Sequence, residues 1–200
     1  MKKSQKDLIT ENDFWYIIEK SLLGKSISNQ NKILASIFQN KSKEELIGFC
    51  YHATKLYRKA YTSRLWAALY IVGGLASDDI FHYFRCWLIY RGRKVYYDAL
   101  SNPDTLMIEF EKCKYQDEIH SDAIVELVYH FYSKKYPQQD ELALVIENEY
   151  DQNYETKGEV EMSETIEFDW KIDDEESLKK LCPQLFNRFW ANQLKQRTLS

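Results

Sequence analysis

Apolar positions recur three and four residues apart along most of the first 135 residues, the spacing of one face of an α-helix. This period predicts helices over about residues 13–23, 29–38, 43–60, 64–72, 78–90, 120–135 and 183–194. Only 6 Gly and 3 Pro occur, so few breakers interrupt the pattern. We predict an all-α fold: a single multi-helix domain with a less regular acidic C-terminal segment and a final short helix.

Capping signals mark several of these boundaries. Ser42 followed by Glu45 has the spacing of a capping box and opens the helix over 43–60. Gly73-Gly74 ends the helix over 64–72, and Ser77 caps the helix that starts at Asp78. These signals are local, so they predict element ends independently of the tertiary fold.

Charge divides the chain unevenly although the net charge is only −4. Residues 139–180 contain 15 acidic and 4 basic side chains, whereas residues 1–138 contain 16 acidic and 20 basic ones. We therefore predict a helical core domain over 1–138 and an acidic segment or arm over 139–180. Residues 181–200 are predicted to form a C-terminal helix that packs on the core.

Several classes of protein are disfavoured by composition. No run approaches the roughly 18 apolar residues of a membrane span, and the lysines near the N-terminus precede no apolar stretch. The four cysteines are widely spaced with no CxxC pair, which favours reduced thiols and a cytoplasmic protein. We expect no membrane contact.

Metal, cofactor and nucleic-acid signals are weak. The four histidines, at positions 52, 82, 120 and 130, join no recognised zinc spacing. No glycine-rich phosphate-binding motif occurs, so we expect no metal and no cofactor. A pI of about 5.7 makes nucleic acid an unlikely partner, because nucleic-acid readers are typically strongly basic.

The stretch over residues 65–93 combines apolar and charged side chains and supplies one candidate site. The ordinary interpretation is helix capping, since Asp78 and Asp79 lie in a first turn and complement the helix dipole. The functional interpretation is a ligand pocket near Gly73–Arg85 formed by Trp66, Tyr70, Asp78, Asp79, His82 and Arg85. Adjacent carboxylates point in different directions on a helix, so catalysis is less favoured and we assign no catalytic residue.

The acidic segment supplies a second candidate site. Aromatic side chains stand among its carboxylates, and aromatic anchors with complementary charge are typical of protein interfaces. The candidate partner-binding residues are Tyr154, Glu159, Glu161, Glu164, Phe168 and Trp170. We expect a basic protein as the partner, and the oligomeric state stays open.

Several stretches carry a family resemblance: FWYII (14–18), the whole of residues 65–93, NPDTL (102–106) and CPQLFNRFW (182–190). They resemble the bacterial family known as domain-of-unknown-function 4240, over most of residues 12–130 with an island near 182–190. Ile80 stands where the family pattern has a small residue. The resemblance implies a small helical protein and no assigned activity, and some similar proteins look like immunity or antitoxin partners.

The residues and the resemblance together favour one function over its alternative. We expect a protein-binding module, of an immunity, antitoxin or regulatory kind, that acts through an acidic aromatic surface. The alternative is a small-ligand-binding protein or an enzyme with its pocket at Gly73–Arg85.

Overall fold

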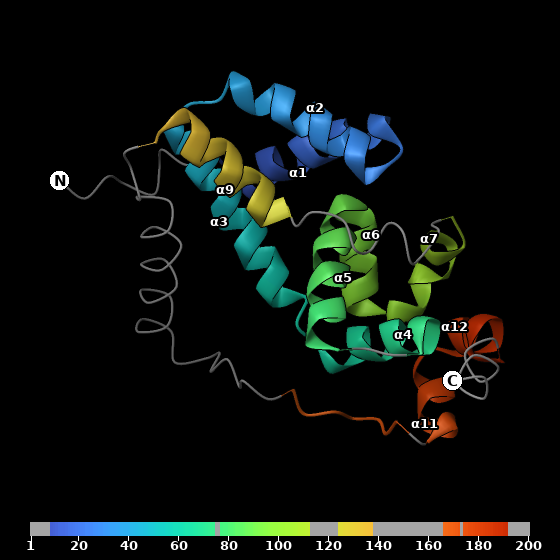
Figure 1. The fold of residues 1–200 in the computed structure, drawn as a ribbon. Helices are drawn as coiled ribbons and strands as arrows, with labels where there is room; N and C mark the ends of the chain where they lie inside the picture. The colour runs from blue at the N-terminus through green and yellow to red at the C-terminus, as the bar shows by residue number, and fades with distance from the viewer. Residues whose placement is uncertain (1–8, 75–76, 113–123, 138–165, 173, 192–200) are drawn as a thin grey trace. The chain divides into compact units, whose positions relative to one another are not determined.

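The computed structural model describes residues 9–74, 77–112, 124–137, 166–172 and 174–191 (Figure 1). All regular structure in these ranges is helical, which confirms the all-α prediction. The chain divides into two compact units, Met1–Arg58 with Asp122–Thr165 and Lys59–Ser121 with Ile166–Ser200. Each unit is thus built from two separate stretches of the chain, and the boundaries at residues 138 and 180 stay predictions.

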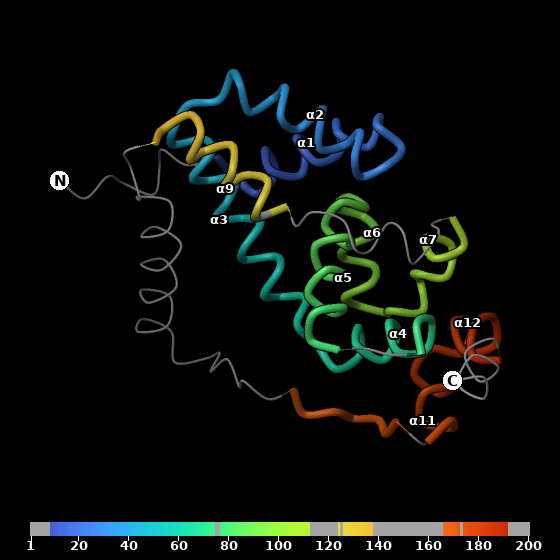
Figure 2. Tube along the Cα trace, viewed as in Figure 1, coloured from blue at the N-terminus to red at the C-terminus, as the bar shows by residue number. Residues whose placement is uncertain are grey.

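The described residues of the first unit form four α-helices and one short 3-10 turn. They are α1 (Glu11–Ser21), η2 (Leu22–Gly24), α2 (Ile27–Gln39), α3 (Lys43–Lys59, whose last residue is assigned to the second unit) and α9 (Ile124–Lys135). Figure 2 shows the trace turning back through η2, so that α2 packs against α1. Helix α9 returns from later in the chain and packs against α2.

Phenylalanine rings form the centre of the first unit. Phe14 and Phe38 are fully buried, and both contact Phe49, with ring centroids 4.6 Å and 4.9 Å from it. Phe131 of α9 lies edge-on to Phe38 at 5.8 Å. Offset and edge-on ring pairs stabilise a core beyond the area they bury, so these contacts join α1, α2, α3 and α9.

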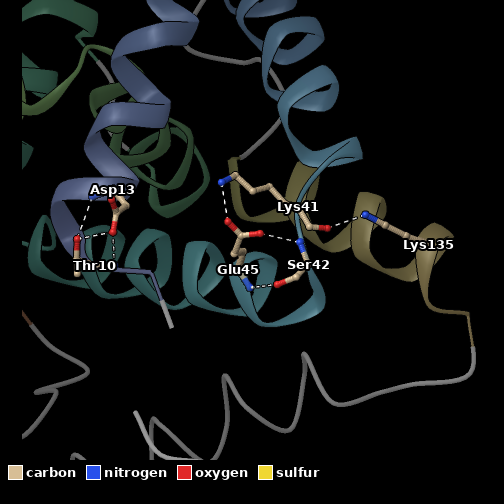
Figure 3. A network of polar contacts seen from close by, with 6 residues as sticks. All are labelled: Thr10, Asp13, Lys41, Ser42, Glu45 and Lys135. Atoms are coloured by element: carbon tan, nitrogen blue, oxygen red, sulfur yellow. Dashed lines mark hydrogen bonds and ion pairs between the residues drawn. The ribbon is translucent and has the colours of Figure 1, made fainter. Parts of the chain in front are cut away.

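Capping boxes begin α1 and α3 of this unit (Figure 3). The backbone N–H of Asp13 donates to Thr10 Oγ1 at 3.2 Å, and Thr10 N–H donates back to the Asp13 carboxylate at 2.9 Å. Ser42 and Glu45 make the same reciprocal pair at 3.2 Å and 2.8 Å, which confirms the capping box at the start of α3. Each box satisfies two N–H groups that a helix end would leave without an acceptor.

Lysines complete this polar network. Lys41 Nζ lies 2.7 Å from Glu45 Oε1, and Lys135 Nζ of α9 donates to the carbonyl oxygen of Lys41 (Figure 3). Lys135 Nζ also donates to the carbonyl oxygen of Gln39. A cation at the end of α2 complements the helix dipole there. Lys135 therefore links two segments that lie more than ninety residues apart in the sequence.

The described residues of the second unit form a larger number of helical elements, most of them shorter. They are α4 (Ser63–Gly73), α5 (Asp78–Tyr90), α6 (Arg93–Ser101), η3 (Pro103–Leu106), α7 (Met107–Lys112), α11 (Glu175–Leu181), α12 (Pro183–Leu185) and the π-helical turn η4 (Phe186–Trp190). Helix α4 packs against α5, η3, α11, α12 and η4. Most of the side chains of this apolar helix are buried.

The predicted ends of α4 and α5 are confirmed. Gly74 ends α4 in the left-handed conformation, with φ of 71°. Ser77 Oγ accepts the N–H of Ile80 at 3.3 Å and caps α5. Among the described residues, no helix is long and apolar enough to cross a membrane.

Candidate functional site

Aromatic side chains gather beside the first turns of α4 and α5. The Trp66 ring centroid lies 4.3 Å from that of Phe81 and 6.1 Å from that of Tyr61. Phe168, a hundred residues further along the chain, lies edge-on to Trp66 at 5.5 Å. We call Tyr61, Trp66, Phe81 and Phe168 the aromatic cluster.

Arg85 of α5 packs against this cluster. Its side chain is 8% exposed, and the guanidinium carbon lies 4.7 Å from the Tyr61 ring centroid and 5.1 Å from that of Phe81. Arg85 Nε donates to the carbonyl oxygen of Phe81 at 3.4 Å. Cation–π contacts of this kind stabilise a buried guanidinium, so Arg85 is a buried packing partner of the cluster.

Ser63, the first residue of α4, holds the segment 166–172 against the helix. Its hydroxyl donates to Asp169 Oδ1 at 2.5 Å, and its carbonyl oxygen accepts the indole N–H of Trp170 at 2.9 Å. The Trp170 ring stacks on Tyr70 with centroids 5.5 Å apart and is 6% exposed. The segment is therefore fixed to α4 by hydrogen bonds and by ring stacking.

Phe168 has different surroundings from Trp170. Its ring stands edge-on to both Trp66 and Trp170, yet 48% of it is exposed. Its neighbours Glu167 and Asp169 are exposed on either side. The segment thus presents an aromatic ring between two carboxylates, and we call Glu167, Phe168 and Asp169 the acidic–aromatic turn.

The predicted pocket residues, all in the second unit, differ in how far they are exposed. Asp78 and Asp79 are exposed in the first turn of α5, and His82 is half-buried beside the Tyr83 ring. Tyr70 is buried, whereas Trp66 is half-exposed. The side chains of Trp66 and Arg85 meet at Phe81.

The two sites predicted separately from the sequence share contacts. Trp66 of the predicted pocket contacts Phe168 of the predicted partner-binding set, and Tyr70 contacts Trp170. Of the remaining partner-binding candidates, Tyr154, Glu159, Glu161 and Glu164 lie outside the described residues. The described parts of both sites therefore form one region of the second unit, and the roles assigned to them stay predictions.

A buried carboxylate organises the C-terminal end of the second unit. Asp104 is 3% exposed, and its oxygens accept the backbone N–H of Gln184 at 3.0 Å and of Leu185 at 2.9 Å. It therefore caps α12 from a position eighty residues earlier in the chain. The two stretches NPDTL and CPQLFNRFW meet at this cap.

Buried thiols have no nucleophilic character here. Burial raises the pKa of Cys50 to about 12. Burial, aided by the charge of Asp104 and opposed by that of Arg64, raises the pKa of Cys182 to about 12. Both thiols stay protonated at neutral pH, so neither can supply a thiolate. Within the described ranges, no group of three or more His, Cys, Asp or Glu side chains could hold a metal ion.

His52 of the first unit is a buried titratable group. It is 8% exposed, and its Nε2 hydrogen-bonds the carbonyl oxygen of Ile9 at 2.9 Å. Burial is the main cause that lowers the pKa of His52, and the positive charge of Lys55 lowers it further. The hydrogen bond with Ile9 and the charges of Glu11 and Asp13 raise the pKa and offset part of this change. His52 therefore packs as a neutral imidazole beneath the N-terminus of α1.

The family model described as "Protein of unknown function (DUF4240)" matches residues 9–152. The chain belongs to this family. The match confirms the resemblance carried by the segments at 14–18, 65–93 and 102–106, and the segment 182–190 lies beyond the matched range. The search of the curated proteins and the search of the solved structures each gave no significant match.

Sequence reasoning missed three residues that position this region. Ser63 lies just before the predicted helix over 64–72, and its contact with Asp169 spans 106 residues and has no local signal. Tyr61 lies in a basic, tyrosine-containing stretch that is easily interpreted as a solvated face. Asp104 follows Pro103 as a first-turn residue, and nothing nearby indicates that it caps another helix.

Proposed function

We propose that this chain is a bacterial protein-binding module, of an immunity, antitoxin or regulatory kind, that docks a basic protein on the acidic–aromatic turn. The observation that carries the proposal is the position of Phe168. The residue is half-exposed although its ring packs on Trp66, and the acidic residues Glu167 and Asp169 flank it. An aromatic anchor inside a charged rim is the usual arrangement of an interface hot spot.

The charge around the aromatic cluster supports a basic partner. Asp78 and Asp79 are exposed one turn before Phe81, which packs on Trp66. Together with Glu167 and Asp169 they place four exposed carboxylates on the elements that form the cluster. Such a field speeds the encounter with a positively charged surface and is weakened by salt.

A small-ligand pocket at Gly73–Arg85 has less support. The guanidinium of Arg85 packs against the rings of Tyr61 and Phe81. The carboxylates of Asp78 and Asp79 are exposed rather than turned into a buried space. The pocket residues therefore support the surface at which we propose the partner docks.

We also propose a cytoplasmic location. Cys50 and Cys182 are buried and carry thiols rather than disulfides. Buried thiols that stay reduced are typical of the reducing compartments of a cell.

A comparison of three baits tests the proposed function. The baits are the unchanged chain, a site variant with Glu167→Lys and Phe168→Ala, and a control with Glu19→Lys and Ile108→Ala, which alters an exposed acid and an exposed apolar residue elsewhere. Lysate of the native host is passed over each bait at low and at high salt. We expect the unchanged chain and the control to retain one basic protein that high salt releases, and the site variant to lose it. Equal retention by the site variant and the control would contradict the proposal.

A further inference from the structure

The acidic–aromatic turn is held in one conformation by its neighbours in the second unit. The Ser63 hydroxyl donates to Asp169 Oδ1 at 2.5 Å and accepts the backbone N–H of Asp169 at 3.3 Å. The Phe168 ring stands at 83° to the ring of Trp66 and at 87° to that of Trp170. A partner therefore meets a ring and a carboxylate that are already ordered, which lowers the entropic cost of binding them.

Acceptor atoms of the turn remain open to a partner. Ser63 occupies one carboxylate oxygen of Asp169, and among the described residues no hydrogen bond or ion pair involves Asp169 Oδ2 or the Glu167 carboxylate. Both acidic residues are exposed, and Phe168 between them is 48% exposed. The turn thus presents part of an aromatic ring beside carboxylate oxygens that lack donors.

The two basic side chains of proteins match such a site to different degrees. The ammonium of lysine is a compact and strongly hydrated point charge, whereas the guanidinium of arginine is planar and more weakly hydrated. The flat face of a guanidinium stacks on a ring while the N–H groups at its edge donate to a carboxylate. A single arginine therefore uses the ring and the carboxylate of the turn together.

The second unit contains the same combination between its own side chains. The guanidinium carbon of Arg188 lies 5.5 Å from the Phe189 ring centroid, and Arg188 Nε lies 2.6 Å from Glu111 Oε1. The side chains of this ion pair are 56% and 41% exposed, so the combination forms at a solvated surface. Lys59 lies over the Tyr97 ring at 5.0 Å, and within the described ranges no carboxylate shares that ammonium.

We propose that the partner of this chain anchors on the acidic–aromatic turn through an arginine. The guanidinium stacks on the exposed part of the Phe168 ring and donates to Asp169 Oδ2, and Glu167 supplies a further acceptor. Arginine is enriched among the residues that dominate binding energy at protein interfaces. The proposal rests on the proposed function and narrows it, because a partner with lysines alone would be steered to the turn without filling it.

Two peptides of equal charge test the choice of arginine. The isotope-labelled full chain is titrated at low salt with a capped peptide of four Gly-Arg repeats and, separately, with one of four Gly-Lys repeats. The amide signals of residues 167–169 report binding. We expect the arginine peptide to bind at least about threefold more tightly, since stacking and a carboxylate bond occur together only with a guanidinium.

Two variants separate the ring from the carboxylate. Phe168→Ala should reduce the affinity for the arginine peptide to that for the lysine peptide. Asp169→Asn keeps an oxygen for Ser63 but places an amide donor at Oδ2, so it should weaken the arginine peptide by about threefold or more. Ile108→Ala changes an exposed apolar residue on α7 and should leave the preference for arginine unchanged.

Equal affinity for the two peptides, no binding of either, or a preference for arginine that survives Phe168→Ala would overturn the proposal. These outcomes are distinct from those of the three baits. A basic host protein lost only by the site variant, together with equal peptide affinities, would contradict the arginine anchor alone. A preference for arginine at the turn, with no host protein retained, would contradict the proposed function alone.

Discussion

Trp170 and Phe168 lie two residues apart in the acidic segment, and their side chains have different surroundings. The Trp170 ring is buried, stacked and hydrogen-bonded to Ser63, whereas Phe168 is half-exposed between carboxylates. Both were predicted as partner anchors because aromatic residues among acids are typical of interfaces. Both rings contact α4, Phe168 through Trp66 and Trp170 through Tyr70, but the Trp170 indole also donates to the Ser63 carbonyl oxygen and its ring is the more deeply buried.

Truncation of each ring separates stability from binding. We expect Trp170→Ala to lower the free energy of unfolding by about 3–5 kcal/mol, because it removes a buried ring. Phe168→Ala removes a half-exposed ring and should cost about 1 kcal/mol or less. Denaturant unfolding of the two variants measures both values. Equal losses would show that Phe168 is as much a part of the core as Trp170.

His52 predicts a pH dependence of stability. Its pKa in the folded chain lies below the ordinary value near 6.5, so the unfolded chain takes up a proton first as the pH falls. The contribution is therefore fully present above about pH 6.5 and is lost as the pH falls below it. We expect the midpoint temperature of thermal unfolding to decrease as the pH is lowered from about 7 to about 5. The His52→Gln variant should show a smaller decrease over the same range.

His130→Gln is the matched control, because His130 is exposed on α9. It should leave the slope between about pH 7 and about pH 5 unchanged. Hydrogen bonds from Thr10 lower the pKa of Asp13, and hydrogen bonds from Lys41 and then from the Ser42 N–H lower the pKa of Glu45, so the contributions of these carboxylates are lost only at more acidic pH. An unchanged slope in His52→Gln would contradict the assignment of a neutral buried imidazole.

At the scale of elements, helix α12, which starts at Pro183, is capped by the side chain of Asp104, a residue of η3. We expect Asp104→Ala to lower the free energy of unfolding by about 1–3 kcal/mol, because it leaves the N–H groups of Gln184 and Leu185 without their acceptor. Hydrogen exchange at these two amides should quicken with it. Asp98→Ala, a half-exposed change on α6, is the control and should leave both amides protected.

Elements with local signals were predictable, and elements that depend on distant partners were not. The capping boxes and glycine stops placed α3, α4 and α5 because such signals act within one turn. Helix α6 starts directly after Gly92, and no helix was predicted over its residues. Helix α11 has 7 residues and buries Leu178 alone, which is too little to give a period in an acidic stretch.

At the scale of the whole chain, the sequence indicated two candidate sites but did not indicate that their residues contact each other. Trp66 and Phe168 lie about a hundred residues apart, and no local pattern connects them. The division into two interleaved units is likewise a property of long-range contacts, which periodicity does not report. The residue types at the site were therefore predictable, whereas their arrangement around Ser63 and Arg85 needed the fold.

The central claim is that a basic protein contacts the acidic–aromatic turn, and a photo-cross-linker at position 168 tests it most directly. Benzoylphenylalanine is placed at Phe168 in the full chain inside the native host, with Ile108 as the matched exposed position. We predict that irradiation joins position 168, and not position 108, to one basic protein, and that Glu167→Lys reduces the yield. Identical products from both positions, or no intermolecular product from position 168, would contradict the account.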